Sequence, residues 1–389
     1  MKKKVIRTAT VAVSLDILLK GQLDYLNQEY NIVAVSSPDI HLLNVANREK
    51  VSTISVAIKR EIAPIQDFIS LIKLYQIFRK EKPFIVHSIT PKAGLLSMIA
   101  AYFAGVPIRI HQFTGLVFPT KTGLMKKLLI FLDKVLCHFA TNIYPEGNGV
   151  KNDLIKYKIT KKPLKIFANG NVNGVDCNLF DPTLFSKIDN NLLKKKLNIN
   201  ENDFVFIFIG RLVRDKGINE LCQAFIKLNL EIKNIKLLLV GGFENHLNPL
   251  MPETYNILKT HKSIISVGFQ PEVRPYFAIA NALVFPSYRE GFPNVVLQAS
   301  AMGLPCIVSN INGCNEIIEE NNNGIVIPSK DEKAIFNAMK LLAINEELTT
   351  QLKQNARPNI IKKFDQKMVW NAVLEEYKLL EKLHYSKSS

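Results

Sequence analysis

Short apolar runs alternate with amphipathic segments along nearly the whole chain. Continuous apolar runs such as FVFIFIG (204–210) and KLLLVGG (236–242) are typical of parallel strands buried on both faces. The alternation occurs in both halves of the chain and therefore predicts two doubly wound α/β domains. We expect a ligand to bind in a cleft between these domains, at the carboxyl ends of the strands.

The pattern assigns most of the chain to strands and helices. The predicted strands are Arg7–Val13, Ile32–Val35, Thr53–Ile58, Phe84–Ser88, Ile108–Phe113, Asn142–Tyr144, Leu164–Phe167, Phe204–Ile209, Lys236–Val240, Ile264–Val267, Ala282–Phe285, Pro305–Val308 and Gly324–Ile327. The predicted helices are Leu18–Gln28, Pro64–Lys80, Lys92–Ala104, Leu124–Phe139, Gly149–Lys156, Ile218–Leu230, Glu272–Ala280, Asn294–Met302, Asp331–Asn345 and Asp365–Leu383.

The length of 389 residues fits two domains of ordinary size. The polar segment 181–202 is the predicted hinge, so we expect one Rossmann-like domain over 1–185 and a second over 186–364. The last segment, 365–389, is predicted to be a helix that packs back on the first domain. The content of 47% hydrophobic and 22% charged residues excludes a disordered, collagen-like or coiled-coil chain.

Hydropathy and cysteine spacing predict a cytoplasmic protein. The longest uncharged apolar stretch, 93–106, is shorter than a membrane span requires. The N-terminus has a basic start, but its apolar run is broken by polar residues, so it does not fit a signal peptide. The five cysteines are scattered without metal-ligand spacing, which predicts no metal site and agrees with a reducing compartment.

The net charge of +16 is concentrated in the first half of the chain. Residues 1–180 contain 25 Lys and Arg against 12 Asp and Glu. A polyanionic partner is one interpretation, and solubility alone is the other. No nucleic-acid-binding motif is present, so an anionic membrane surface is the favoured partner. Lys126, Lys127 and Lys134 lie beside apolar residues in the segment 121–140, as on an interfacial helix or on a core helix with a solvated edge.

Several common motifs are absent from the sequence. There is no GxxxxGK[ST] phosphate loop and no GxGxxG dinucleotide fingerprint. There is also no GxSxG nucleophile elbow and no Asp-x-Asp pair that would hold a metal and a nucleotide. These absences argue against nucleotide hydrolysis by a phosphate loop, dinucleotide-dependent redox chemistry and α/β-hydrolase chemistry.

The first candidate site motif is IGRLVRDKG (209–217), which follows a predicted strand and precedes a predicted helix. Gly210 allows a ligand to approach the backbone. Arg211 and Lys216 are placed so that both cations can reach one diphosphate, although solvated loop charges are an equal alternative from this motif alone. Gly241, in the glycine pair that ends the next strand, is a weaker indication of the same kind.

The most specific motif is SYREGFPNVVLQASAMGLP (287–305). It places Glu290 after a predicted strand and begins a helix near Asn294, whose free N–H groups favour a phosphate. Gln298 is eight positions after Glu290, one to two turns into the helix that begins near Asn294. The candidate ligand-binding residues of this motif are Glu290, Gly291, Phe292, Pro293, Asn294 and Gln298.

With these motifs the chain resembles the retaining, nucleotide-sugar-dependent glycosyltransferases of family 4, which have the GT-B fold. The resemblance covers nearly the whole chain. It is carried by the GRL..DKG loop, the glycine pair, VGF at 267–269, the S-x-x-EGFPN helix start and GCNE at 313–316. LLKGQLDYL (18–26), the segment 87–111 and NGNVNGVD (169–176) are similar to the branch that builds capsule and O-antigen repeat units on undecaprenyl diphosphate.

The resemblance implies a role for each matched residue. Arg211 and Lys216 would neutralise the donor diphosphate and stabilise the departing nucleotide, and Glu290 would bind hydroxyls of the donor sugar. The 291–294 backbone would hold sugar and phosphate. The resemblance and their positions also suggest ligand contacts for four residues: Gly21 at the approach of donor and acceptor, Phe269 and Gln270 beside the nucleobase, and Lys92 at a phosphate.

Two positions depart from the family pattern. The family has a second Glu eight residues after the first, where this chain has Gln298, so we expect slightly weaker donor binding. Many relatives carry a His where this chain has Thr114, and His111 lies three residues earlier. His111 and Thr114 therefore remain candidates for the reaction centre, and no general base is assigned. The front-face mechanism usually assumed for the family, in which the leaving phosphate takes the acceptor's proton, needs none.

The predicted activity is the transfer of a hexose or N-acetylhexosamine from a UDP-sugar, with retention, to a polyprenyl-diphosphate-linked glycan. The resemblance implies no metal and no other cofactor. It places the enzyme at the inner face of the plasma membrane as a peripheral protein. Two alternatives stay open from the sequence: a nucleotide-sugar epimerase, which can share this fold, and a non-catalytic assembly or lipid-binding protein, suggested by Gln298 and Thr114.

Overall fold

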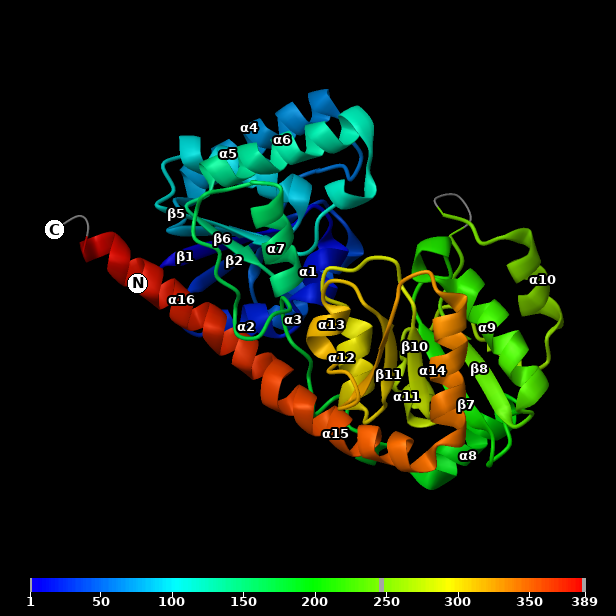
Figure 1. Ribbon diagram of the computed structural model, residues 1–389. Coiled ribbons are helices and arrows are strands. Elements are labelled where there is room, and N and C mark those ends of the chain that lie inside the picture. Colours follow the sequence, from blue (N-terminus) through cyan, green and yellow to red (C-terminus); the bar gives the residue numbers. More distant parts are fainter. Residues whose placement is uncertain (1, 245–247, 387–389) are drawn as a thin grey trace. The chain divides into compact units, whose positions relative to one another are not determined.

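The computed structural model describes residues 2–244 and 248–386 and forms two compact units (Figure 1). The described residues up to Gly174, together with those from Gln366 onward, make up the first unit. The second unit extends from Val175 to Asp365. The boundary thus falls before the predicted position at residue 185, because Val175, Cys177 and Phe180 pack into the core of the second unit.

The first unit contains a six-stranded parallel sheet with the strand order β3-β2-β1-β4-β5-β6. The strands are β1 (Lys4–Thr8), β2 (Asn31–Ser36), β3 (Ser52–Ser55), β4 (Ile85–Ser88), β5 (Ile108–Phe113) and β6 (Asn142–Pro145). The helices are α1 (Ala12–Leu18), α2 (Gln22–Asn27), α3 (Ile40–Glu49), α4 (Pro64–Glu81), α5 (Pro91–Phe103), α6 (Gly123–Phe139), α7 (Asn148–Lys156) and α16 (Gln366–Ser386).

Helices cover both faces of this sheet. Neighbouring residues of β1 point to opposite faces, and Val5 packs in one hydrophobic cluster while Ile6 packs in another. The cluster around Val5 takes side chains from α1, α2, α3 and α16. The cluster around Ile6 takes side chains from α4, α5 and α6. The chain's last helix therefore packs within the first unit and completes the cover of one sheet face.

The second unit repeats the architecture, with the strand order β12-β11-β10-β7-β8-β9 and parallel pairing. The strands are β7 (Phe204–Ile209), β8 (Ile235–Val240), β9 (Ile264–Ser266), β10 (Ala282–Phe285), β11 (Cys306–Ser309) and β12 (Gly324–Ile327). The α-helices are α8 (Lys187–Lys196), α9 (Ile218–Glu231), α10 (Pro252–Thr260), α11 (Arg274–Ala278), α12 (Asn294–Ala301), α13 (Cys314–Ile317), α14 (Glu332–Ile344) and α15 (Glu346–Phe364). The predicted fold, two doubly wound parallel sheets, is confirmed.

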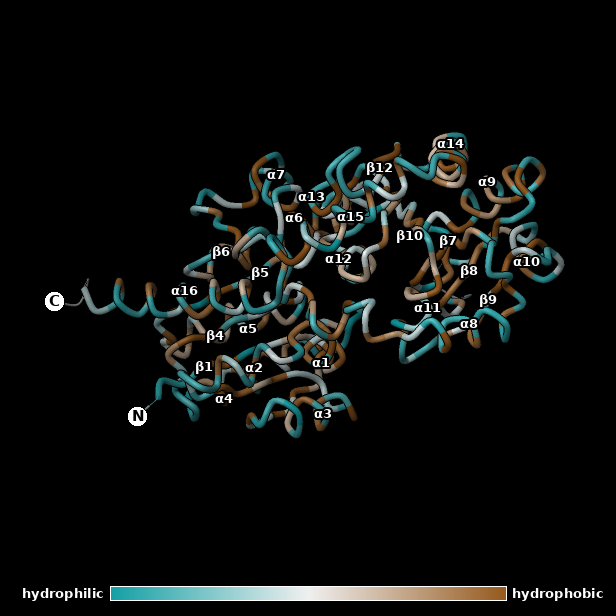
Figure 2. Tube along the Cα trace, turned by 90° about the horizontal axis from the view of Figure 1, so that it is seen from below, coloured by the Kyte–Doolittle hydropathy of each residue, from teal (hydrophilic) through white to brown (hydrophobic). Residues whose placement is uncertain are grey.

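Hydrophobic residues are concentrated along β7 and β8, whereas hydrophobic and hydrophilic positions alternate along α16 (Figure 2). This difference follows from burial, since a central parallel strand is covered on both faces and a surface helix on one. In β8, Leu237, Leu238 and Leu239 are each fully buried. Their successive side chains point to alternate faces, so helices must cover both sides of this sheet as well.

Some predicted elements were wrong. The strand predicted over Arg7–Val13 ends at Thr8, because Ala12 already begins α1. A short apolar run fits a strand or a buried helix equally well. The predicted strand Leu164–Phe167 is reduced to an isolated bridge between Ile143 and Leu164. The predicted hinge contains helix α8, and the pattern also missed α3, α10, α13 and α15.

The helix predicted over 18–28 corresponds to α2 alone, which is shorter, and a separate helix, α1, precedes it. Leu18 ends α1 and Gln22 begins α2. Gly21 lies between them with φ +82°, a left-handed conformation that breaks the helix and that glycine adopts without a steric penalty. The helix predicted over 365–383 corresponds to α16, which begins one residue later because Asp365 separates it from α15. Residues 19–21 thus separate α1 from α2, and Asp365 alone separates α15 from α16.

Candidate functional site

The glycines that follow β7 and β8 let two backbone segments pass in close contact. A Cβ atom added at Gly241 would lie 1.8 Å from the carbonyl oxygen of Gly210. The Gly241 N–H donates to the Gly268 carbonyl over 2.8 Å, which ties the ends of β8 and β9 together. The structure thus supplies a packing reason for glycine at 241, beside the ligand approach that the sequence predicts.

The loop after β7 is fixed by a second glycine. Arg214–Lys216 form one 3-10 turn, and Gly217, with φ +71°, is the N-cap of α9. A Cβ at Gly217 would lie 2.2 Å from the Pro286 carbonyl oxygen, in the loop after β10. The Tyr288 N–H of that loop donates to the Asp215 carbonyl over 2.8 Å. The two motif-bearing loops are therefore in direct backbone contact.

This contact brings together two of the predicted site residues. Lys216 Nζ forms an ion pair with Glu290 Oε1, and Ser287 Oγ donates to the same carboxylate oxygen over 2.7 Å. The side chains of Lys216 and Glu290 are each 16% exposed, so the pair is partly withdrawn from water. Lys216 Nζ also lies 5.2 Å from the centre of the Phe285 ring. The pair reaches the surface while its charges are only partly screened.

Arg211 lies on the same loop but has another partner. Its guanidinium Nη1 lies 2.5 Å from Glu244 Oε2, and the Arg211 side chain is 59% exposed. An exposed ion pair of this kind contributes little free energy and is open to exchange with another anion. Arg211 and Lys216, predicted to act on one diphosphate, are thus each held by a carboxylate of the chain.

The EGFPN segment forms the entry to α12. Phe292 and Pro293 are buried, and the Phe292 ring packs against Phe364 at 5.5 Å between centres. The Gly291 backbone packs closely against Gly313, since a Cβ added at Gly313 would lie 2.4 Å from the Gly291 carbonyl oxygen. Asn294 is the first residue of α12 and is half-buried. The segment is therefore a rigid turn whose backbone is fixed by core packing.

The remaining residues predicted to contact the nucleotide differ in their exposure to solvent. Gln298 is half-buried on α12, and Gln270 donates through Nε2 to the Val267 carbonyl over 2.7 Å. Phe269 is 77% exposed, beside Gln270 in the loop after β9. A large aromatic ring so exposed is free to stack on a planar group such as a nucleobase.

Three residues around the Lys216–Glu290 pair were not predicted from the sequence. Ser287 positions the carboxylate, and Tyr288 donates through its hydroxyl to Glu220 Oε1 over 2.5 Å. Cys314 is fully buried close to the pair, and burial, with the charge of Glu290 adding, raises the pKa of its thiol. Ser287 and Tyr288 belong to the motif that contains Glu290. Ser287 contacts Glu290 within this motif, whereas the partner of Tyr288 lies on α9, distant in sequence.

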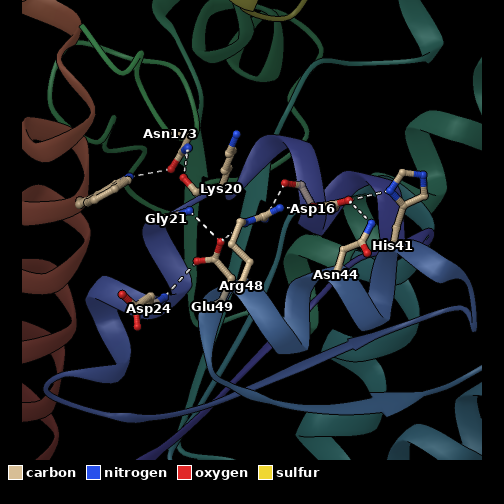
Figure 3. Close-up of polar contacts among 10 residues, drawn as sticks. Asp16, Lys20, Gly21, Asp24, His41, Asn44, Arg48, Glu49 and Asn173 are labelled. Carbon is tan, nitrogen blue, oxygen red and sulfur yellow. Dashed lines mark hydrogen bonds and ion pairs between the residues drawn. The ribbon is translucent and has the colours of Figure 1, made fainter. Parts of the chain in front are cut away.

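In the first unit, Gly21 lies in a polar network (Figure 3). The Gly21 N–H donates to Glu49 Oε1 over 2.8 Å and the Asp24 N–H donates to Glu49 Oε2 over 3.1 Å. Glu49 is fully buried at the end of α3, where Arg48 Nε donates to it over 2.7 Å. A Cβ at Gly21 would lie 2.6 Å from Cη2 of Trp370. Contacts within the chain thus account for glycine here.

Asp16 anchors the other side of this network. His41 Nδ1 lies 2.6 Å from Asp16 Oδ2, and the Arg48 guanidinium contacts both Oδ1 and the main-chain oxygen of Asp16. Burial acts to raise the pKa of Asp16, but the hydrogen bonds from His41 and Arg48 outweigh it and lower the pKa. The network ties α1 to α3 and thereby fixes the turn that contains Gly21 (Figure 3).

The three residues predicted near an acceptor or the reaction centre all have partners within the first unit. Lys92 Nζ pairs with Asp67 Oδ1 over 2.8 Å, and its side chain is 17% exposed. Thr114 Oγ1 donates to the Ile89 carbonyl over 2.8 Å. His111 is fully buried, and its Nδ1 lies 2.8 Å from Ser88 Oγ.

His111 has the environment of a core residue. Its ring meets Phe113 edge to face at 4.5 Å between centres. A Cβ at Gly94 would lie 2.4 Å from Cε1 of His111, so α5 needs glycine there to accommodate the ring. Burial lowers the pKa of His111 to about 3, which keeps the imidazole neutral at physiological pH. Lys92, His111 and Thr114 thus each have a partner within the first unit.

Two other features are absent from the described residues. No cluster of three or more His, Cys, Asp or Glu side chains with metal-binding geometry occurs within 2–244 and 248–386. Over the same residues, no helix combines the length and the apolar character needed to cross a bilayer.

Two family models match the chain, one in each unit. The model described as "Glycosyl transferase 4-like" matches residues 11–146, and "Glycosyl transferases group 1" matches residues 189–358. The second range includes both loops that form the Lys216–Glu290 pair. The group 1 match therefore falls on the part of the chain where the structure assembles charged side chains.

Curated relatives match over most of their length. The capsular polysaccharide biosynthesis glycosyltransferase CapM of Staphylococcus aureus is 32% identical over 378 residues, covering 96% of this chain and 97% of CapM. The UDP-Gal:alpha-D-GlcNAc-diphosphoundecaprenol alpha-1,3-galactosyltransferase of Escherichia coli is 32% identical over 310 residues, covering 79% of this chain and 78% of that enzyme.

A solved structure shares the fold. The crystal structure of Anabaena Alr3699/HepE in complex with UDP and glucose superimposes with a TM-score of 0.81 and 15% identity, covering 97% of this chain and 99% of that one. The solved structure shows the fold, and the two curated relatives, both named as transferases, support a transferase rather than the epimerase or the non-catalytic protein that the sequence left open. The chain belongs to the family 4 glycosyltransferases and is a glycosyltransferase with the GT-B fold.

Proposed function

We propose that this enzyme transfers a hexose or N-acetylhexosamine from a UDP-sugar, with retention, to a polyprenyl-diphosphate-linked glycan in surface polysaccharide synthesis. The names of two relatives support the polysaccharide product, the UDP-sugar donor and the lipid-linked acceptor. CapM is named for capsular polysaccharide biosynthesis, and the Escherichia coli relative is named for a UDP-galactose donor and a diphosphoundecaprenol acceptor. In this proposal the second unit binds the donor and the first binds the acceptor.

The observation that carries the proposal is the juxtaposition of Lys216 and Glu290 at the ends of two strands of the second unit. Lys216, with Arg211, offers positive charge to a diphosphate, and Glu290 offers a carboxylate to sugar hydroxyls. A nucleotide sugar presents these two groups side by side, because its diphosphate is bonded directly to the sugar. The paired side chains thus match the donor's charge pattern.

The donor's negative charge needs no metal in this scheme. Arg211 and Lys216 supply cationic groups for the diphosphate, and the rigid backbone at the start of α12 supplies N–H groups. We therefore expect transfer to continue in the presence of EDTA. Loss of activity with EDTA and its return with Mg²⁺ would refute this part of the proposal.

The acceptor's proton passes to the leaving diphosphate oxygen in the proposed mechanism. The acceptor oxygen forms a bond to the anomeric carbon on the face that the diphosphate leaves, and the carbon–oxygen bond to the diphosphate breaks. His111 is poorly suited as a base, since it is buried, neutral and bonded to Ser88. Lys216 and Arg211 stabilise the departing charge, so the basicity of a side chain is not required.

A membrane surface is the proposed location of the acceptor. On the helices of the first unit, α4 exposes Ile65 and Phe68, and α6 exposes Leu124 and Phe131. Helix α5 packs between α4 and α6 (Figure 1). Lys127 lies exposed on α6 among these apolar side chains. Apolar residues with adjacent lysines suit the interface of an anionic bilayer.

Transfer assays test the reaction directly. We expect the purified enzyme to transfer a sugar from one of UDP-galactose, UDP-N-acetylglucosamine or UDP-N-acetylgalactosamine to an undecaprenyl-diphosphate-linked sugar, with a product detectable by mass spectrometry. Glu290→Ala should lower the rate by about a hundredfold or more. Glu347→Ala, at an exposed position of the same unit, is the matched control. A wild-type rate for Glu290→Ala would refute the assignment.

Binding to vesicles tests the membrane surface separately. The protein should cosediment with vesicles that contain phosphatidylglycerol and much less with phosphatidylcholine alone, and high salt should release it. Replacing Phe68 and Phe131 by Ser should weaken this binding while the rate on a short-chain water-soluble acceptor stays unchanged. Equal binding of the double variant would refute the assigned surface.

A further inference from the structure

The two side chains best placed to bind a donor occupy each other in the free enzyme. Glu290 Oε1 accepts from both Lys216 Nζ and Ser287 Oγ. Ser287 is fully buried, which fixes the carboxylate next to the ammonium group. The pair is 16% exposed on either side, so water screens it less than it screens the Arg211–Glu244 pair.

A free nucleoside diphosphate faces a cost at such a site. To contact Lys216, its diphosphate must compete with Glu290 for the ammonium group. The carboxylate then remains beside the diphosphate, where like charges repel and water is partly excluded. A nucleoside diphosphate has no hydroxyl next to its terminal phosphate that could donate to the displaced carboxylate.

An intact nucleotide sugar does not face this cost to the same degree. Its hydroxyls can donate to Glu290 while its diphosphate takes Lys216, so each member of the pair exchanges one partner for another. We propose that Glu290, through its ion pair with Lys216, determines the preference of the site for the intact nucleotide sugar over the free nucleoside diphosphate. This inference rests on the proposed function and concerns the same site.

The exchange has a consequence for turnover. After sugar transfer the sugar hydroxyls are no longer attached to the diphosphate, and Glu290 again competes for Lys216. The re-formed pair favours departure of the nucleotide product. Arg211 does not supply this selectivity, because its partner Glu244 is 37% exposed and the repulsion it exerts is screened by water.

Calorimetric titration of purified enzyme with UDP tests the inference. Glu290→Gln keeps an oxygen that can accept from Lys216 and Ser287 but removes the charge, so we expect UDP to bind about tenfold more tightly than to the wild type. Binding of UDP-galactose and UDP-N-acetylgalactosamine should gain less or weaken, so that the preference for the intact donor falls. Glu347→Gln removes one exposed charge from the same unit and should leave UDP affinity unchanged.

A second variant, Lys216→Met, separates competition for Lys216 from plain charge repulsion between Glu290 and the diphosphate. In Lys216→Met the competing ammonium is gone, so adding Glu290→Gln should tighten UDP binding far less than in the wild type. Circular dichroism and thermal melting establish that each variant is folded. A weaker or unchanged UDP affinity in Glu290→Gln would overturn the inference, as would equal tightening in both backgrounds.

The inference and the proposed function fail differently. GDP and ADP are titrated beside UDP, and the diphosphate that the wild type binds most tightly serves as the probe. Preference for GDP or ADP would refute the UDP donor but leave the exchange testable on that nucleotide. If neither the wild type nor Glu290→Gln binds any of the three, the Lys216–Glu290 pair is not a diphosphate site and the inference is wrong.

Discussion

Replacing Gly21 by Ala probes why glycine lies between α1 and α2. The residue has φ +82°, and an added Cβ would lie 2.6 Å from Cη2 and 2.9 Å from Cζ2 of Trp370. The left-handed backbone costs a non-glycine residue about 1–2 kcal/mol. Overpacking against the ring adds about 1–3 kcal/mol. We therefore expect Gly21→Ala to lower the free energy of unfolding by about 2–5 kcal/mol.

A second substitution separates the two contributions. Trp370→Phe shortens the ring so that it no longer reaches the Cη2 position, while Asn173 Oδ1 keeps its contact with Gln22 Nε2 at 3.2 Å. In this background Gly21→Ala should cost only the backbone part, about 1–2 kcal/mol. Urea denaturation of the four proteins gives the coupling energy directly. An equal cost of Gly21→Ala in both backgrounds would refute the reasoning.

The same four proteins distinguish packing from ligand approach. If glycine serves only the packing against Trp370, kcat/KM of Gly21→Ala should recover in the Trp370→Phe background, at a temperature where all four are folded. If ligands must approach Gly21, as the chain's resemblance to the family implies, kcat/KM of Gly21→Ala should stay low in both backgrounds. A stability readout alone cannot separate these roles, so both measurements are needed.

Three further perturbations test other parts of the structure. Gln298→Ala should weaken nucleotide binding about fivefold and Gln298→Glu should strengthen it, because a carboxylate accepts hydroxyl hydrogens more strongly than an amide; equal affinities by calorimetry would contradict the assignment. Burial holds the pKa of His111 at about 3, below the value of about 6.5 in the unfolded chain. Between these pH values the unfolded state binds one more proton than the folded state, so the free energy of unfolding should fall as pH drops from 6.5 to 3. His111→Gln should show a shallower slope of unfolding free energy against pH. Arg357→Leu should destabilise the second unit by about 3–5 kcal/mol in urea denaturation, because Arg357 Nη1 donates to the carbonyls of Phe180 and Ala301, both at 2.6 Å, and an unchanged midpoint would refute this.

Much of the fold could be predicted from the sequence because buried parallel strands have a distinct composition. The predicted strand Phe204–Ile209 coincides with β7, and Ala282–Phe285 coincides with β10. Helix ends were harder to predict. The break at Gly21 depends on the direction that the chain must take to pack, which residue periodicity does not reveal, whereas the start of α16 was predicted to within one residue.

The residue types of the candidate site were likewise evident in the sequence. Lys216 and Glu290 belong to motifs that each suit a phosphate or a sugar, and Gly217 marks a tight turn. Lys92 and His111 were less predictable, because a cation or an imidazole suits a ligand site and a structural role equally well. Their contacts with Asp67 and Ser88 resolve how each is held within the first unit.

By itself the sequence determined the two α/β units, the strands and the chemical groups available for binding, since these follow from local patterns of apolar and polar residues. Only the tertiary structure decided which groups meet. Lys216 and Glu290 are 74 positions apart, and they form a pair because the loops after β7 and β10, neighbouring strands of a parallel sheet, leave the sheet at the same edge. The partner of a charge is set by distance through space, which the order of residues along the chain does not contain.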